Sequence, residues 1–151
     1  MAKLQTAQYL KQLFQRQSHH PEIKFPIPQL DSDSSFGNMG FTTYYEHITK
    51  AFTHAPKAHV HDFPQFLIYL GERENMLEID AEIEINLSLD GKKMEKHNIT
   101  RATSIYLPPG LWHGPLIYHK VNKPFMFIDL YFSEHYAKIY DKKGQVGQRK
   151  L

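Results

Sequence analysis

Hydrophobic and polar residues alternate most regularly along residues 77–89, LEIDAEIEINLSL. Every second position is apolar and the positions between are polar, which is the period of a β-strand with one buried and one solvent-facing side. Asp90-Gly91 follows as a hairpin turn signal. The run QFLIYL at 65–70 is apolar throughout and predicts a strand buried on both faces.

Three further segments have strand character, at residues 40–52, 103–116 and 123–132. No helical pattern of ten or more residues separates these segments, so parallel βαβ units are not expected. The sequence therefore predicts an all-β fold, an antiparallel barrel or sandwich, over residues 36–136.

The first 35 residues differ from this β pattern. Apolar residues at spacings of three and four predict a short amphipathic N-terminal helix over residues 3–17. They are Leu4, Ala7, Leu10, Leu13 and Phe14. Three prolines in residues 18–38 predict an extended arm after it. The apolar stripe of this helix packs either on its own barrel or on a neighbouring copy, and we expect a homodimer. Residues 137–151 are expected to form a polar, basic, frayed tail.

Composition narrows the class of partner. Lys plus Arg number 18 and Asp plus Glu 16, a formal charge of +2, which does not favour nucleic acid or an acidic membrane surface. The chain has no cysteine, so disulfides and thiolate metal sites are excluded. No segment reads as a signal peptide or a membrane span, and the expected compartment is the cytoplasm.

Residues 59–65, HVHDFPQ, are the first candidate metal-binding segment. On a strand, residues i and i+2 share a face, so His59 and His61 would direct both imidazoles into one space. Gln65 has the same parity and could add an oxygen ligand. In a chain with ten histidines, about 0.65 such pairs are expected by chance, so this pair alone is weak support for a metal site.

A second motif strengthens the metal hypothesis. Pro108, Gly110 and His113 form P-x-G-x-x-H, a pattern expected by chance only about 0.03 times in this composition. The proline-glycine turn fixes where the following strand begins and therefore the direction of His113.

The combination of both motifs resembles the cupin superfamily. His59, His61, Gln65 and Gly71 fit its first motif, with glutamine in the place of glutamate. Pro108, Gly110 and His113 fit the second, although Ala102 and Ile117 replace its first glycine and last asparagine. The resemblance implies an antiparallel double-stranded β-helix, the jelly-roll barrel, and one divalent metal ion inside it.

The predicted ligands are His59, His61, His113 and Gln65. Because the amide is neutral, this set favours zinc, iron, nickel or copper, and manganese stays open. Glu82 or Glu84 could supply a carboxylate, although a solvent-facing strand surface is the simpler interpretation. His54 could support the site from outside the ligand set, and a metal role for His19-His20 is not expected.

Two functions remain open. The first is a small cytoplasmic metal-dependent enzyme, a dioxygenase, isomerase or decarboxylase acting on a small oxygen-rich molecule. The second is a barrel that binds or senses a small ligand without turnover. No catalytic residue is predicted from the sequence.

Overall fold

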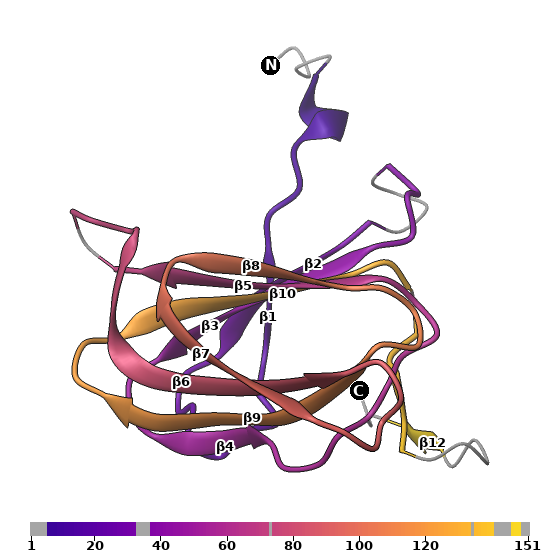
Figure 1. The fold of residues 1–151 in the computed structure, drawn as a ribbon. Coiled ribbons are helices and arrows are strands. Elements are labelled where there is room, and N and C mark those ends of the chain that lie inside the picture. The colour runs from indigo at the N-terminus through magenta and orange to yellow at the C-terminus, as the bar shows by residue number, and fades with distance from the viewer. Residues whose placement is uncertain (1–5, 33–36, 73, 134, 141–145, 149–151) are drawn as a thin grey trace.

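The computed structural model describes residues 6–32, 37–72, 74–133, 135–140 and 146–148. The secondary structure of this part of the chain is almost entirely β (Figure 1). Its elements are a 3-10 turn η1 (Ala7–Tyr9) and the strands β1 (Phe14–Arg16), β2 (Ile27–Asp31), β3 (Thr42–Ile48), β4 (Phe52–Ala55), β5 (Gln65–Gly71), β6 (Glu78–Ser88), β7 (Glu95–Arg101), β8 (Thr103–Leu107), β9 (Trp112–Val121), β10 (Phe125–Tyr131), β11 (Ala137–Ile139) and β12 (Val146–Gln148). Among these residues, no helix has the length and apolar character that crossing a membrane requires.

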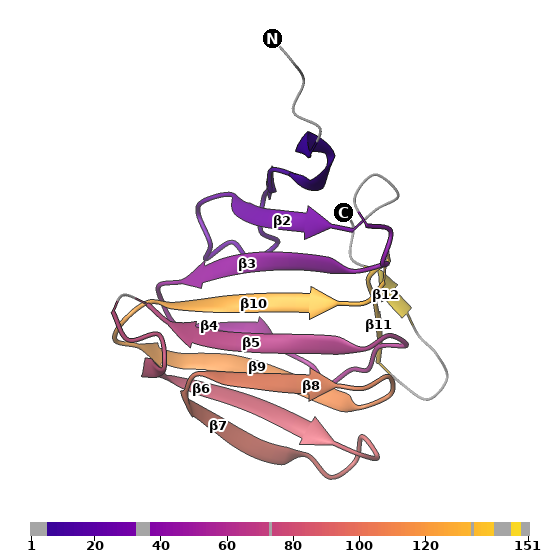
Figure 2. The same ribbon diagram turned by 90° about the horizontal axis from the view of Figure 1, so that it is seen from above.

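The strands form two facing antiparallel sheets (Figures 1 and 2). One sheet has the order β1-β2-β3-β10-β5-β8, and the other has the order β4-β9-β6-β7. β11 and β12 form a separate small hairpin. The predicted all-β, antiparallel jelly-roll fold is confirmed.

The core lies between the sheets and follows the period of two. β5 and β10 bury every second side chain, and the residues between are only half-buried. The largest fully buried side chains are Tyr44, Tyr69, Tyr118, Phe125 and Phe127. The prediction that residues 65–70 are buried on both faces is wrong, because the outer face of an antiparallel sheet can remain partly in contact with solvent.

The predicted N-terminal helix is not present among the described residues. Within them only the single turn η1 is helical, and residues 14–16 form β1, which pairs with β2. Leu10 is 79% exposed, so its side chain does not pack against an apolar surface of the protein. A helix of about 15 residues is marginal in water without such packing, whereas β1 gains ladder hydrogen bonds with β2. Leu4 lies outside the described residues.

The segment after β10 returns to the barrel. The backbone N–H of Val60 donates to Ile139 and that of Ile139 donates to Val60, each at 2.9 Å. Figure 2 shows β11 and β12 together at one end of the sheets. Residues 137–139 are therefore part of the fold and not the frayed tail that their polar composition suggested.

Candidate metal centre

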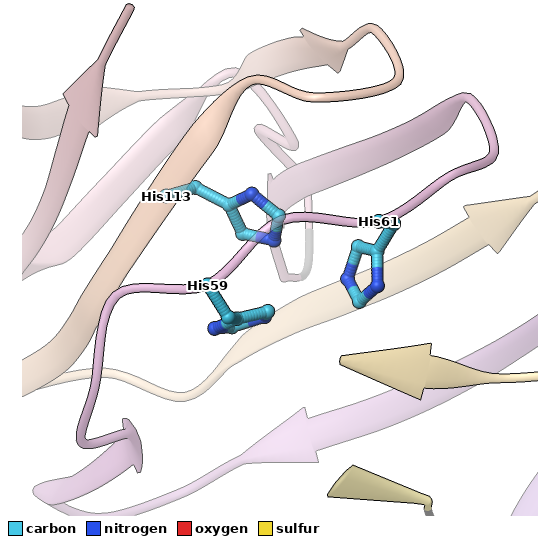
Figure 3. A group of neighbouring side chains, drawn as sticks. All are labelled: His59, His61 and His113. Carbon is cyan, nitrogen blue, oxygen red and sulfur yellow. The ribbon is translucent and has the colours of Figure 1, made fainter. Parts of the chain in front are cut away.

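Three imidazoles meet at the end of the barrel that β11 covers. The N–H of His59 donates to the carbonyl of His113, and that of His113 donates to His59, both at 2.9 Å, so the two motifs lie side by side. His61 follows two residues after His59. One ligand atom from each ring lies within 4.8 Å of those of the other two, and all three residues are buried (Figure 3).

The proline-glycine turn connects the second motif to the first. Leu111 donates its N–H to the carbonyl of Pro108 at 3.1 Å, which closes the turn. Gly110 donates its N–H to the carbonyl of His61 at 2.9 Å, and its φ of 84° is the left-handed region that glycine adopts easily. The turn therefore fixes both the start of β9 and the backbone beside His61.

Each ring is oriented by one backbone carbonyl. Nδ1 of His59 bonds to Lys57 at 2.9 Å, that of His61 to Ala137 at 2.6 Å, and that of His113 to Leu111 at 3.0 Å. A carbonyl oxygen only accepts, so each Nδ1 carries the hydrogen and each Nε2 has the lone pair that can bind a metal. This arrangement is how metal-binding histidines are held in proteins.

Two of the rings, those of His59 and His113, are also neutral over the physiological pH range. Burial, together with the nearby His113 and Lys138, lowers the pKa of His59 to about 2. Burial lowers the pKa of His113 to about 4, although its bond to Leu111 acts in the opposite direction. A neutral imidazole is the form that binds a metal, so no proton has to leave these two rings first.

Gln65 lies on the same inner surface. Its Nε2 donates to Asp129 Oδ1 at 2.7 Å, and Asp129 Oδ2 also accepts the Tyr44 hydroxyl at 2.5 Å. Gln65 Oε1 is buried and has no hydrogen-bond donor among the described residues. A buried polar atom without a donor requires a water or an ion, so the donor set fits a metal ion.

A cavity of about 30 Å³ adjoins these groups. Gln65, His59 and His113 line it, together with Asp129, Lys138 and His54. That volume holds one or two water molecules, or one small functional group of a bound ligand.

Neither candidate carboxylate reaches the imidazoles. Glu84 bonds to Lys96 and His119, both at 2.8 Å, on the outer face of the four-stranded sheet. Its hydrogen bonds to Lys96, Asn86 and His119 lower its pKa to about 2. Glu82 is exposed and lies opposite Lys120 on β9. Both are on the polar side of an alternating strand, so they are excluded from this group of ligands.

Two neighbours of the site were missed from the sequence. Asp129 shares the inward parity of the buried Phe125 and Phe127, and a carboxylate in an otherwise apolar strand was the available signal. Lys138 lines the cavity from β11, and the polar composition of that segment gave no such signal. His54 lines the cavity too, but its ring bonds to Glu46 Oε2 at 2.9 Å.

The fold and these imidazoles together define a small β-barrel with a buried three-histidine group. No protein-family model matches the chain, and no curated protein matches it. Solved structures do. Oxalate oxidase in complex with the substrate analogue glycolate is 16% identical, with a TM-score of 0.53 over 81% of this chain and 57% of that one.

Two further structures are similar. Oxalate decarboxylase is 12% identical, with a TM-score of 0.50 over 76% of this chain and 27% of that chain. The capsular polysaccharide assembling protein CapF from Staphylococcus aureus is 7% identical, with a TM-score of 0.55 over 92% and 34%. All three have the cupin fold, and this chain has the same fold. The chain spans a little over half of the oxidase and about a third or less of the other two.

Proposed function

We propose that this chain binds one divalent metal ion through His59, His61 and His113, with Gln65 Oε1 as a fourth ligand. The observation that carries the proposal is the orientation of the three rings, since each Nδ1 is bonded to a backbone carbonyl and each Nε2 is left to bind the ion. The proposed ion is zinc, iron, nickel, copper or manganese.

The charge of the site favours an anionic ligand. The proposed ligand set is neutral, so it does not offset the charge of a divalent ion, and Lys138 adds a cation beside it. Asp129 is the acidic residue that lines the cavity, and its oxygens accept from Gln65 and Tyr44. We therefore infer that the ligand is a small carboxylic or hydroxy acid. The similar oxidase was solved with glycolate, a molecule of this kind.

A bound ion would act on such a ligand as a Lewis acid. The residues of the chain would do the rest: Asp129 holds the Gln65 amide in place, and Lys138 draws the carboxylate toward the imidazoles. On this basis we propose a metal-dependent enzyme of the dioxygenase, isomerase or decarboxylase type. The alternative is a barrel that binds or senses the acid without turnover, and glutamine in place of glutamate favours it, because a weaker ligand set suits binding over turnover.

Metal content tests the first part of the proposal. Purified wild-type protein is loaded with Zn²⁺ or Fe²⁺, dialysed and measured by elemental analysis, beside His113→Ala and the control His97→Ala. His97 is exposed on the outer strand β7. We expect His97→Ala to retain the wild-type content and His113→Ala to lose one equivalent. Equal content in wild type and His113→Ala would refute the site.

Turnover separates the two functions. Oxygen uptake and CO₂ release are measured on metal-loaded protein with oxalate, glycolate and a panel of diketones and hydroxy acids, and binding of the same acids is measured by calorimetry. Turnover that disappears in His113→Ala identifies the enzyme, and binding without turnover identifies the sensor. Lys138→Met should weaken binding of the acids about tenfold, a loss of one charge contact, whereas Lys120→Met on the exposed part of β9 should not.

We also propose a cytoplasmic homodimer. Tyr9, Leu10 and Leu13 are exposed beside the edge strand β1, and such an apolar segment favours contact with a second copy. Light scattering on wild type and on a Leu10→Ser, Leu13→Ser variant tests the dimer, which the variant should weaken. Cell fractionation tests the location.

A further inference from the structure

A second group of metal-binding side chains lies away from the three imidazoles described above. Glu46 is on the inner face of β3 and is 0% exposed. The Ser18 hydroxyl donates to its Oε1 at 2.9 Å, and His54 Nε2 bonds to its Oε2 at 2.9 Å. The carboxylate is thus buried and held in one orientation by two side chains from different segments.

Two adjacent histidines of the arm face this carboxylate. Neighbouring side chains of an extended chain point in opposite directions, but the chain bends at His19 and His20. Their ring centroids are therefore only 3.7 Å apart, and His20 is 4.1 Å from the ring of His54. Ligand atoms of His19, His20 and Glu46 all lie within 4.8 Å of one another.

We propose that His19, His20 and Glu46 form a second divalent-cation site, with Ser18 and His54 as positioning residues for the carboxylate. Two imidazoles and one carboxylate are a ligand set that zinc and ferrous iron accept, with positions left for water. Side-by-side imidazolium cations would repel each other, so the close packing of these rings favours the neutral, metal-binding form.

The burial of Glu46 supports a cation rather than an isolated acid. Glu46 is 0% exposed, and its two oxygens hydrogen-bond to the side chains of Ser18 and His54. A carboxylate buried in this way requires positive charge nearby. A metal ion supplies that charge, and an ion pair with His54 is the competing explanation.

His54 connects the two groups. Its ring bonds to Glu46 on one side, and its side chain also lines the cavity beside His59 and Gln65. The second site does not depend on the first, because it shares none of the ligands proposed there. The two sites can therefore be occupied and lost separately.

Metal stoichiometry tests the second site. Full-length wild type, His19→Ala, His20→Gln and the control His135→Ala are titrated with Zn²⁺ and then with Co²⁺, whose visible spectrum reports nitrogen and oxygen ligation. His19 and His135 are both exposed, so neither variant removes a core residue. We expect two equivalents in wild type and in His135→Ala. His19→Ala and His20→Gln should bind the second equivalent at least tenfold more weakly.

The first site is distinguished by repeating the titration on His113→Ala. One equivalent that remains there and disappears when His20→Gln is added supports the second site, whatever happens at the first. Zinc binding that is unaffected by His19→Ala and His20→Gln would overturn the proposal. A wild type that binds one equivalent, lost entirely in His113→Ala, would overturn it too and leave Glu46 as the hydrogen-bond partner of His54.

Discussion

Gln65→Glu should make the stability of the metal-free protein depend on pH in a way that wild type does not show. The amide nitrogen of Gln65 lies 2.7 Å from Asp129 Oδ1. The substitution replaces that nitrogen with an oxygen, so two carboxylates would face each other in a buried position. Glutamine at this position avoids that repulsion, which is a physical reason for its presence where the cupin motif has glutamate.

The repulsion can be estimated from the distance. Two unit charges 2.7 Å apart repel by about 6 kcal/mol at an effective dielectric constant of about 20. The pair should therefore keep one proton, and one of its pKa values rises above neutrality. The unfolded chain releases that proton above about pH 4.3, the ordinary pKa of glutamate. Relative to wild type, the free energy of unfolding of the variant then falls by about 1.4 kcal/mol per pH unit, or up to about 4 kcal/mol between pH 5 and 8.

Urea unfolding of metal-free wild type and variant at pH 5, 6.5 and 8 measures this difference. Gln29→Glu is the matched control, because Gln29 also donates to an aspartate, Asp31, at 2.9 Å. There Arg16 donates to Gln29 Oε1 at 2.7 Å and would pair with the new carboxylate, so we expect a change below about 1 kcal/mol.

Metal should reverse the effect of Gln65→Glu. A divalent ion at the three imidazoles offsets the second negative charge, so the loaded variant should regain stability at pH 8 and bind the ion more tightly than wild type. If the metal-free variant shows the same pH dependence as wild type, Gln65 does not face a charged Asp129, and the contact that would hold its Oε1 as a ligand atom is absent.

Three further results are expected. Because the pKa values of His59 and His113 are lowered to about 2 and 4, the unfolded chain takes up protons below its ordinary pKa of 6.5 before the folded chain does. Urea unfolding of the metal-free protein should therefore show stability falling by up to about 3 kcal/mol per pH unit between pH 6 and 4, and a flat profile would contradict the neutral rings. Gly114→Ala combines a φ of 98° with a Cβ only 2.7 Å from a backbone oxygen, so it should lower the melting temperature more than Gly110→Ala, whose Cβ meets nothing within 4 Å; equal shifts would contradict the clash. Glu84→Gln should leave metal content unchanged, since Glu84 lies on the outer face, and lost metal would show that this carboxylate reaches the site.

The β architecture could be predicted because its signal is local. The alternation of residues 77–89 sets which side chains of β6 face the core, and the structure buries Ile83 and Ile85 as that pattern requires. The helix expected at 3–17 failed because its spacing was correct but Leu10, Leu13 and Phe14 of its stripe remain exposed. Pairing with β2, which depends on residues well along the chain, decided the conformation of residues 14–16 instead.

The imidazole group could be proposed from sequence because the spacing of His59 and His61 and the turn before His113 are local features. The residues that orient the group could not. The carbonyl that fixes His61 belongs to Ala137, 76 residues away, and a backbone carbonyl leaves no trace in residue identity.

The sequence also contains a signal for the group formed by His19, His20 and Glu46. Glu46 has the inward parity of the buried Tyr44 and Ile48, and an acidic residue at such a position requires an internal partner. The partners themselves, Ser18 and His20, come from an arm whose course no local pattern fixes.

The pairing of β11 with Val60 has a practical consequence for the preparation of this protein. A protease nick near residue 137, or an affinity tag that pulls this strand from Val60, would free the His61 ring without touching either histidine motif. Such a sample would keep its barrel and its circular-dichroism spectrum yet lose the proposed ion, so elemental content would be the sharper measure of an intact carboxyl-terminal segment.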